Sequence, residues 1–99
     1  MNRFEDIRQW AEARNLIKGS TPEKQALKLF EEVGELSGAL AKQRLADVVD
    51  GIGDAVVVLT IMAAQLGIPI EECINAAWDE IKDRRGRMVD GVFVKEEDL

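Results

Sequence analysis

Residues 29–42, LFEEVGELSGALAK, decide the fold, because they combine an apolar helical pattern with three carboxylates. An α-helix turns by about 100° per residue, so residues three or four apart share a face. Glu32 and Glu35 are three apart, and Glu31 and Glu35 are four apart. The stretch therefore predicts a helix that carries an acidic line beside an apolar one.

The helix that holds this stretch is expected to span residues 22–44. Thr21 and Pro22 are a strong start signal, since a capping hydroxyl is followed by proline at the first helical position. One face of this helix is apolar or small at five positions. These are Leu27, Phe30, Val33, Ser37 and Leu40.

Three more helices are predicted, over residues 2–14, 45–66 and 70–86, with Asn2 as a cap and Gly67 as a stop. The helix over 45–66 is apolar on nearly every side, so we expect it to be central and buried. Asp90-Gly91 lies between short apolar runs and predicts a β-hairpin. Residues 95–99 form an acidic tail that is expected to fray.

Length and composition predict one all-α domain over residues 1–99, a four-helix-type bundle. Too few helices remain to cover the central one, so we expect completion by homo-oligomerisation, as a homodimer or homotetramer. The net charge of −6 argues against a nucleic-acid partner. Residues 55–70, the longest uncharged run, fall short of the roughly 20 residues of a membrane span. The single cysteine and the polar N-terminus suit a cytoplasmic location.

Three acidic residues also lie on the apolar helix expected over residues 45–66. Asp47, Asp50 and Asp54 repeat at spacings of three and four, and only Lys42 and Arg44 are basic nearby. A charge in an apolar environment is costly unless it is compensated, and Mg²⁺ or Mn²⁺ prefers carboxylate ligands. The pattern favours a metal site, although glutamate pairs on helices are usually solvated surface.

The chain contains no histidine, which excludes Ser-His, Cys-His and His-metal chemistry. Cys73 is expected to be a small core residue rather than a nucleophile. Trp10 and Trp78 fit apolar stripes, so core packing is favoured over stacking on a base.

EEVGEL, followed by DGIGDAVVVL, resembles the MazG family of all-α nucleoside triphosphate pyrophosphohydrolases. The resemblance extends to Trp10 and QALKLFEE. It implies Mg²⁺-dependent cleavage of a nucleoside triphosphate to a monophosphate and pyrophosphate. By position, it implies that Glu32, Glu35 and Asp54 bind metal and that Glu31 binds a second metal or orients water.

One position departs from the family pattern, which places glutamate where this chain has Gly51. Asp50 lies four residues before Asp54 and is assigned the missing role, with Asp47 as the alternative. In the implied reaction, Glu31 or Glu32 orients or deprotonates the attacking water.

Basic and amide side chains are expected to hold the substrate's phosphates. Gln25 and Lys28 share the glutamate stripe, and Asn75, Lys82 and Arg85 share a stripe on the helix over 70–86. Ordinary solvated side chains are an equally good interpretation of each of these residues.

Two other functions compete with nucleoside triphosphate hydrolysis. The first is a catalytically silent helical oligomer, a binding or regulatory module, which Gly51 favours. The second is a relative that acts on phosphoribosyl-ATP, which shares the acidic motif. We rank the second lower, because DGIGD is more similar to the MazG type.

Overall fold

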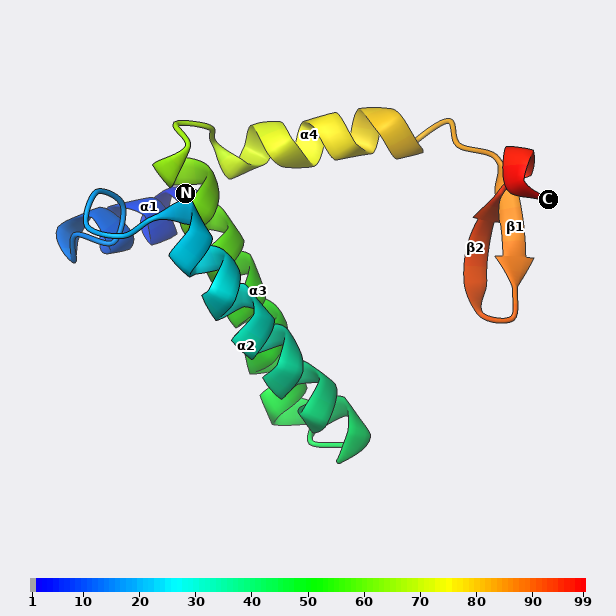
Figure 1. Cartoon of the computed structure of the whole chain (residues 1–99), viewed down its shortest axis with the longest axis horizontal. Coiled ribbons are helices and arrows are strands. Elements are labelled where there is room, and N and C mark those ends of the chain that lie inside the picture. Colours follow the sequence, from blue (N-terminus) through cyan, green and yellow to red (C-terminus); the bar gives the residue numbers. More distant parts are fainter. Residues whose placement is uncertain (1) are drawn as a thin grey trace.

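The computed structural model describes residues 2–99 and contains four α-helices followed by a two-stranded hairpin (Figure 1). The predicted all-α fold with a C-terminal hairpin is confirmed. The elements are α1 (Arg3–Ala13), α2 (Pro22–Ala41), α3 (Leu45–Gln65), α4 (Ile70–Ile81), β1 (Gly86–Val89), β2 (Val92–Lys95) and the 3₁₀-helix η1 (Glu96–Asp98).

The helix boundaries follow local signals in the sequence. The Asn2 side chain accepts a hydrogen bond from Phe4 N at 2.8 Å, and Thr21 Oγ1 accepts one from Lys24 N at 3.2 Å. Gly67 adopts a φ of +74° after α3, where Ile68 N donates to Ala63 O at 2.9 Å. This left-handed C-terminal cap confirms the predicted stop.

Helices α2 and α3 lie side by side as an antiparallel hairpin, because only three residues connect them (Figure 1). Gly51 is buried at their contact. A Cβ at this position would lie 3.3 Å from both Cβ and Cδ1 of Leu36. The two helices therefore approach closely at Gly51, where any side chain would meet α2.

Helix α1 packs across α3 near the open end of this hairpin. Ala11 and Thr60 are fully buried, and Thr60 Oγ1 donates to Val56 O at 2.7 Å. Gln65 Nε2 donates to Leu16 O at 3.0 Å, which ties the loop after α1 to the end of α3. These contacts position α1 and its loop beside the α2–α3 pair.

Helix α4 projects away from the α2–α3 hairpin, at 105° to α3, and carries the β-hairpin at its far end (Figure 1). Its first turn is held by Glu71, which accepts from Arg8 Nη1 and from Asn2 Nδ2, both at 2.7 Å. The hydrogen bond from Arg8 lowers the pKa of Glu71 from 4.5 to about 2. This ion pair fixes the direction in which α4 leaves the rest of the chain.

The β-hairpin has the register Val89↔Val92, so Asp90 and Gly91 form a two-residue turn. Their φ angles are +51° and +82°, as a type I′ turn requires. The acidic tail after it forms η1, where fraying was expected.

Three expectations from the sequence are wrong within this chain. Helix α4 ends at Ile81 rather than at Gly86, and α2 ends at Ala41 rather than at Arg44. Helix α3 is not buried all round, since Val49 and Ile52 are exposed. Because α3 packs against α2 and α1 on one side only, its opposite side stays open.

Three residues that were assigned to the core are also exposed. Trp10, Trp78 and Cys73 all have substantial solvent exposure. Trp78 and Cys73 belong to α4, which the direction set by Glu71 separates from α2. Over residues 2–99, no single helix has the length and hydropathy of a membrane span, although α3 and α4 meet the criterion jointly across their 105° bend.

Candidate functional site

A cavity of about 400 Å³ lies where α1 and its loop meet the α2–α3 hairpin. Four polar side chains line it: Gln25, Lys28, Glu32 and Asp54. Its other walls are Trp10, Leu16, Val57, Val58 and Ile61. The sequence placed all four polar residues at one site, and the structure brings them together.

Glu32 is the central group of this cavity. It is only 7% exposed, although it is charged. Its Oε1 lies 3.4 Å from Lys28 Nζ, while its Oε2 is buried and accepts no hydrogen bond from the described residues. A buried carboxylate oxygen without a donor is costly, so this atom is free to bind a partner other than residues 2–99.

Lys28 lies between two glutamates. Its Nζ is 3.4 Å from Glu32 Oε1 and 3.7 Å from Glu31 Oε2. The hydrogen bond to Glu32 and the charge of Glu31 raise the pKa of Lys28, so it remains cationic. Glu31, which the sequence placed at the same site, is exposed and is not one of the residues that line this cavity.

A second cavity, of about 320 Å³, holds the remaining predicted ligands. Glu35, Asp47 and Asp50 line it together with Lys42 and Arg44. Glu35 is one helical turn after Glu32, and Asp50 is one turn before Asp54 on the antiparallel α3. The predicted ligands thus form two groups along the hairpin, and Asp50 accompanies Glu35 rather than Asp54.

The buried position of Gly51 explains the departure from the family pattern in physical terms. A side chain there would point at Leu36, between α2 and α3, rather than into either cavity. In this packing, glutamate at position 51 would require Leu36 to shift. Asp47, Asp50 and Asp54 are the α3 carboxylates that line the two cavities.

The donor set fits a hard divalent cation. Among residues 2–99, no three acidic, cysteine or histidine side chains gather closely enough to enclose an ion. Mg²⁺ rarely needs such a cage, because it usually binds through one or two carboxylates, waters and substrate phosphates. Glu32 and Asp54 offer two carboxylates in one cavity, including the unpartnered Oε2.

The predicted phosphate-binding residues of the fourth helix lie elsewhere. Lys82 pairs with Asp79 at 3.3 Å, and Arg85 lines a separate cavity with Glu80 and Glu96. Asn75 is exposed on α4, which projects away from the α2–α3 hairpin. Within one chain, only Gln25 and Lys28 of the five predicted residues line the carboxylate cavity.

Trp10 is a lining residue that the sequence reading assigned to the core. It lines the carboxylate cavity and also a further cavity, whose other walls are Asp6, Ile7, Asp54 and Val57. Arg14 lies over its ring, 4.4 Å from the centroid. The spacing of Trp10 on α1 could not reveal that it lines a cavity, because this depends on how α1 crosses α3.

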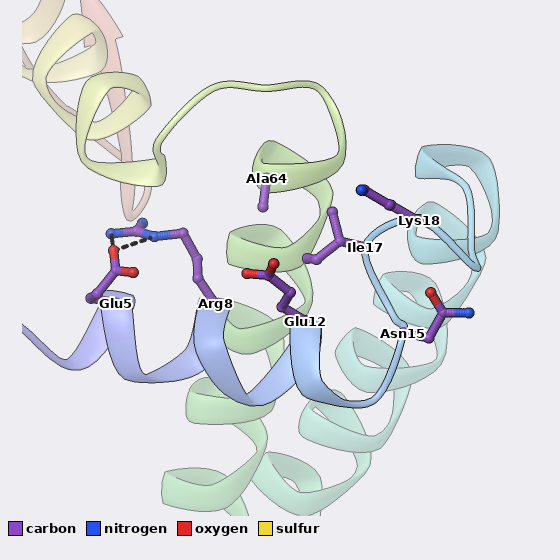
Figure 2. A pocket seen from close by; sticks show the side chains of 7 residues that line it. All are labelled: Glu5, Arg8, Glu12, Asn15, Ile17, Lys18 and Ala64. Carbon is purple, nitrogen blue, oxygen red and sulfur yellow. Dashed lines mark hydrogen bonds and ion pairs between the residues drawn. The ribbon is translucent and has the colours of Figure 1, made fainter.

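Another cavity, of about 480 Å³, lies on a different part of α1 and its loop (Figure 2). Its walls are Glu5, Arg8, Glu12, Asn15, Ile17, Lys18 and Ala64. Arg8 is already engaged, because Glu5 and Glu71 both pair with its guanidinium (2.8 and 2.7 Å). This cavity contains none of the predicted site residues, so its volume alone does not make it the functional site.

The fold and site define a class of all-α proteins in which a helical hairpin presents carboxylates to a cavity. The family model described as phosphoribosyl-ATP pyrophosphohydrolase matches residues 8–84, and the chain belongs to this family. The family is part of the MazG-like group of all-α pyrophosphohydrolases. The predicted group is therefore confirmed, but the match is to the relative ranked lower, and MazG itself is not confirmed.

A phage protein is also similar to the chain. It is an uncharacterized 18.2 kDa protein in the rep-hol intergenic region of Haemophilus phage HP1, 50% identical over 62 residues. The match covers 63% of this chain and 38% of that protein, so it spans less than half of the relative. No solved structure matches the chain significantly.

Proposed function

We propose that this chain is a metal-dependent pyrophosphohydrolase that cleaves nucleoside triphosphates to a nucleoside monophosphate and pyrophosphate. The observation that carries the proposal is the buried Glu32 Oε2, which lacks a donor in a cavity shared with Asp54 and Lys28. Family membership supports hydrolysis of a nucleotide phosphoanhydride.

Glu32 and Asp54 would hold Mg²⁺ or Mn²⁺, and Glu35 with Asp50 would hold a second ion one turn along the hairpin. Asp47 lines the second cavity and is the alternative to Asp50. A bound divalent ion neutralises phosphate charge and lowers the pKa of coordinated water. Without such ions, these carboxylates would repel an anionic triphosphate.

Lys28 and Gln25 are the residues of this chain that would contact phosphate oxygens. Lys28 stays cationic beside Glu31 and Glu32, and a phosphate could take the place of either carboxylate on its Nζ. Gln25 Nε2 donates to Ser20 Oγ at 3.1 Å, which holds the amide at the cavity wall. Both residues are on α2, one or two turns before the carboxylates.

Glu31 is the candidate general base. It is exposed and adjoins Glu32, so it can orient a water molecule and accept its proton. The water oxygen bonds to the α-phosphorus, the α–β bridge breaks, and pyrophosphate leaves with the bridging oxygen. The reaction requires neither histidine nor a covalent intermediate.

A second candidate substrate is phosphoribosyl-ATP, which the family match favours specifically. The same bond is broken in this substrate, so the roles of Glu31, Glu32 and Asp54 are unchanged. The two substrates differ only in the group attached to the base.

The first test is pyrophosphate release from nucleoside triphosphates and from phosphoribosyl-ATP, with Mg²⁺, with Mn²⁺ and with a chelator. We expect metal-dependent release that Asp54→Asn lowers by about 10³-fold or more, with the helical signal in circular dichroism intact. The preferred substrate then decides between the two candidates. If the folded protein hydrolyses neither substrate with either metal, the proposal is wrong, and a silent binding module becomes the better interpretation.

A further inference from the structure

A further cavity adjoins the carboxylate cavity where α1 packs across α3. Its volume is about 400 Å³, and its walls are Asp6, Ile7, Trp10, Asp54 and Val57. We refer to it as the Asp6 cavity. Trp10, Asp54 and Val57 line both cavities. A ligand held at Asp54 can therefore extend from the carboxylate cavity into the Asp6 cavity.

The two cavities differ in charge. Gln25 and Lys28, the residues proposed to contact phosphate, line the carboxylate cavity but not the Asp6 cavity. No cationic side chain of residues 2–99 lines the Asp6 cavity, whose walls are apolar or aromatic apart from two carboxylates. These carboxylates repel a phosphate group. The Asp6 cavity is therefore suited to the uncharged, planar base of a nucleotide rather than to its phosphates.

Trp10 gives the Asp6 cavity an aromatic wall. It is 46% exposed, so part of its surface is open to a ligand. Arg14 holds the ring in place, because its guanidinium lies 4.4 Å from the ring centroid and its Nη1 donates to Trp10 O at 3.1 Å. Bases stack on aromatic side chains with little discrimination, since every base has a flat face. A preference for one base must therefore come from a polar group in the cavity.

Asp6 is the polar group that can supply this preference. It lies one helical turn before Trp10 on the same face of α1, and it is half-buried. Its Oδ2 accepts a hydrogen bond from Arg3 Nη1 at 2.9 Å, whereas its Oδ1 accepts none from a side chain in the described part of the chain. A carboxylate is only an acceptor, so Asp6 favours a base that presents N–H groups.

We propose that Asp6 makes this chain selective for guanine nucleotides, an inference that rests on the proposed function and specifies its substrate. Guanine presents two adjacent donors, N1–H and the 2-amino group, which match the two oxygens of a carboxylate. Adenine and cytosine present an amino group beside a ring-nitrogen acceptor. Uracil and thymine place N3–H between two carbonyl oxygens. Since the carboxylate repels each of these acceptors, guanine is bound best and uracil or thymine worst.

Isothermal titration of the full chain with guanosine monophosphate and with uridine monophosphate, in the presence of Mg²⁺, tests the preference without turnover. We expect the guanosine compound to bind about 10-fold or more tightly than the uridine compound. Asp6→Asn replaces one acceptor oxygen by a donor and should reduce this ratio to about threefold or less. Arg3→Gln is the matched control, because it removes the surface ion pair but keeps the Asp6 carboxylate, and it should leave the preference in place.

The titrations also separate this proposal from the proposed reaction. Equal affinity of the natural protein for the two monophosphates would overturn the role of Asp6 even if triphosphates are hydrolysed, and this comparison requires no variant to fold. A guanine preference that persists unchanged in Asp6→Asn would overturn it as well. Conversely, a guanine preference that depends on Asp6, in a protein that hydrolyses no triphosphate, would support the role of Asp6 and refute the reaction.

Discussion

Two residues on α2 lie in environments that are the reverse of what their side chains suggest. Glu32 is 7% exposed, and Phe30, two residues earlier, is 77% exposed. A charged group is buried on one side of the helix while an aromatic ring is open to solvent on the other. The comparison teaches that the burial of a side chain on α2 depends on which side of the helix meets α3 and not on the polarity of the side chain.

The largest expected effect comes from the buried side of α2. Glu32→Gln should lower pyrophosphate release by about 10³-fold or more, because it removes the charge of the best-buried carboxylate while keeping its shape. Steady-state turnover measures the loss. Glu23→Gln, at an exposed position in the first turn of the same helix, is the control and should stay within about twofold. Turnover of E32Q within tenfold of the natural protein would remove Glu32 from the site.

A substitution at Gly51 tests the buried contact between α2 and α3. Gly51→Glu should lower the free energy of unfolding by about 2–4 kcal/mol, since it forces a charged side chain between α2 and α3. It should not raise turnover, although it restores the family pattern. Gly53→Glu is the matched control, because a Cβ at Gly53 meets nothing within 4 Å. Chemical denaturation separates the two variants, and equal stability would contradict the close approach at Leu36.

The ion pair between α1 and α4 gives a pH-dependent effect. The pKa of Glu71 is lowered to about 2 in the folded protein, so this carboxylate stabilises the fold at pH values above its ordinary pKa of 4.5. The contribution is lost as the pH falls from 4.5 toward 2. Glu71→Gln should therefore be less stable than the natural protein at neutral pH, with the difference disappearing by about pH 2. Denaturation of both proteins across this range provides the measurement. Glu72→Gln, the exposed neighbour, is the control, and a difference that does not change with pH would contradict the role of Glu71.

The smallest effect concerns the turn that sets the register of α2 against α3. Gln43 has a φ of +56°, which is unfavourable for a residue with a Cβ. Gln43→Gly should raise the free energy of unfolding by about 0.5–1 kcal/mol, because glycine adopts this conformation without strain. Lys42→Gly, at a φ of −92°, should not stabilise. A loss of stability in Q43G would indicate that the glutamine side chain has a role of its own.

Much of the fold could be predicted because its signals are local. Asn2, Thr21-Pro22, Gly67 and Asp90-Gly91 each specify a cap, a start, a stop or a turn within a few residues. The end of α4 could not be read in this way, since residues 82–85 carry no strong breaker before Gly86. The direction of α4 depends on Glu71 meeting Arg8, 63 residues away, which no local pattern reveals.

The sequence predicted which carboxylates line the cavities, but not how they are divided between the two cavities. Helical spacing places Glu32 and Glu35 on one acidic face, and it places Asp50 and Asp54 on another. Only the antiparallel pairing of α2 with α3 places Glu32 in one cavity with Asp54 and Glu35 in another cavity with Asp50. The same pairing places Gly51 against Leu36, and the crossing of α1 over α3 brings Trp10 to the cavity wall.

By itself, the sequence determined the four helices, the hairpin turn and the acidic and apolar faces of α2, because periodicity and capping act over a few residues. The tertiary structure alone decided which face is buried. Burial depends on which helix lies opposite, and here α3 packs against the side of α2 that carries Glu32, while the side that carries Phe30 stays open.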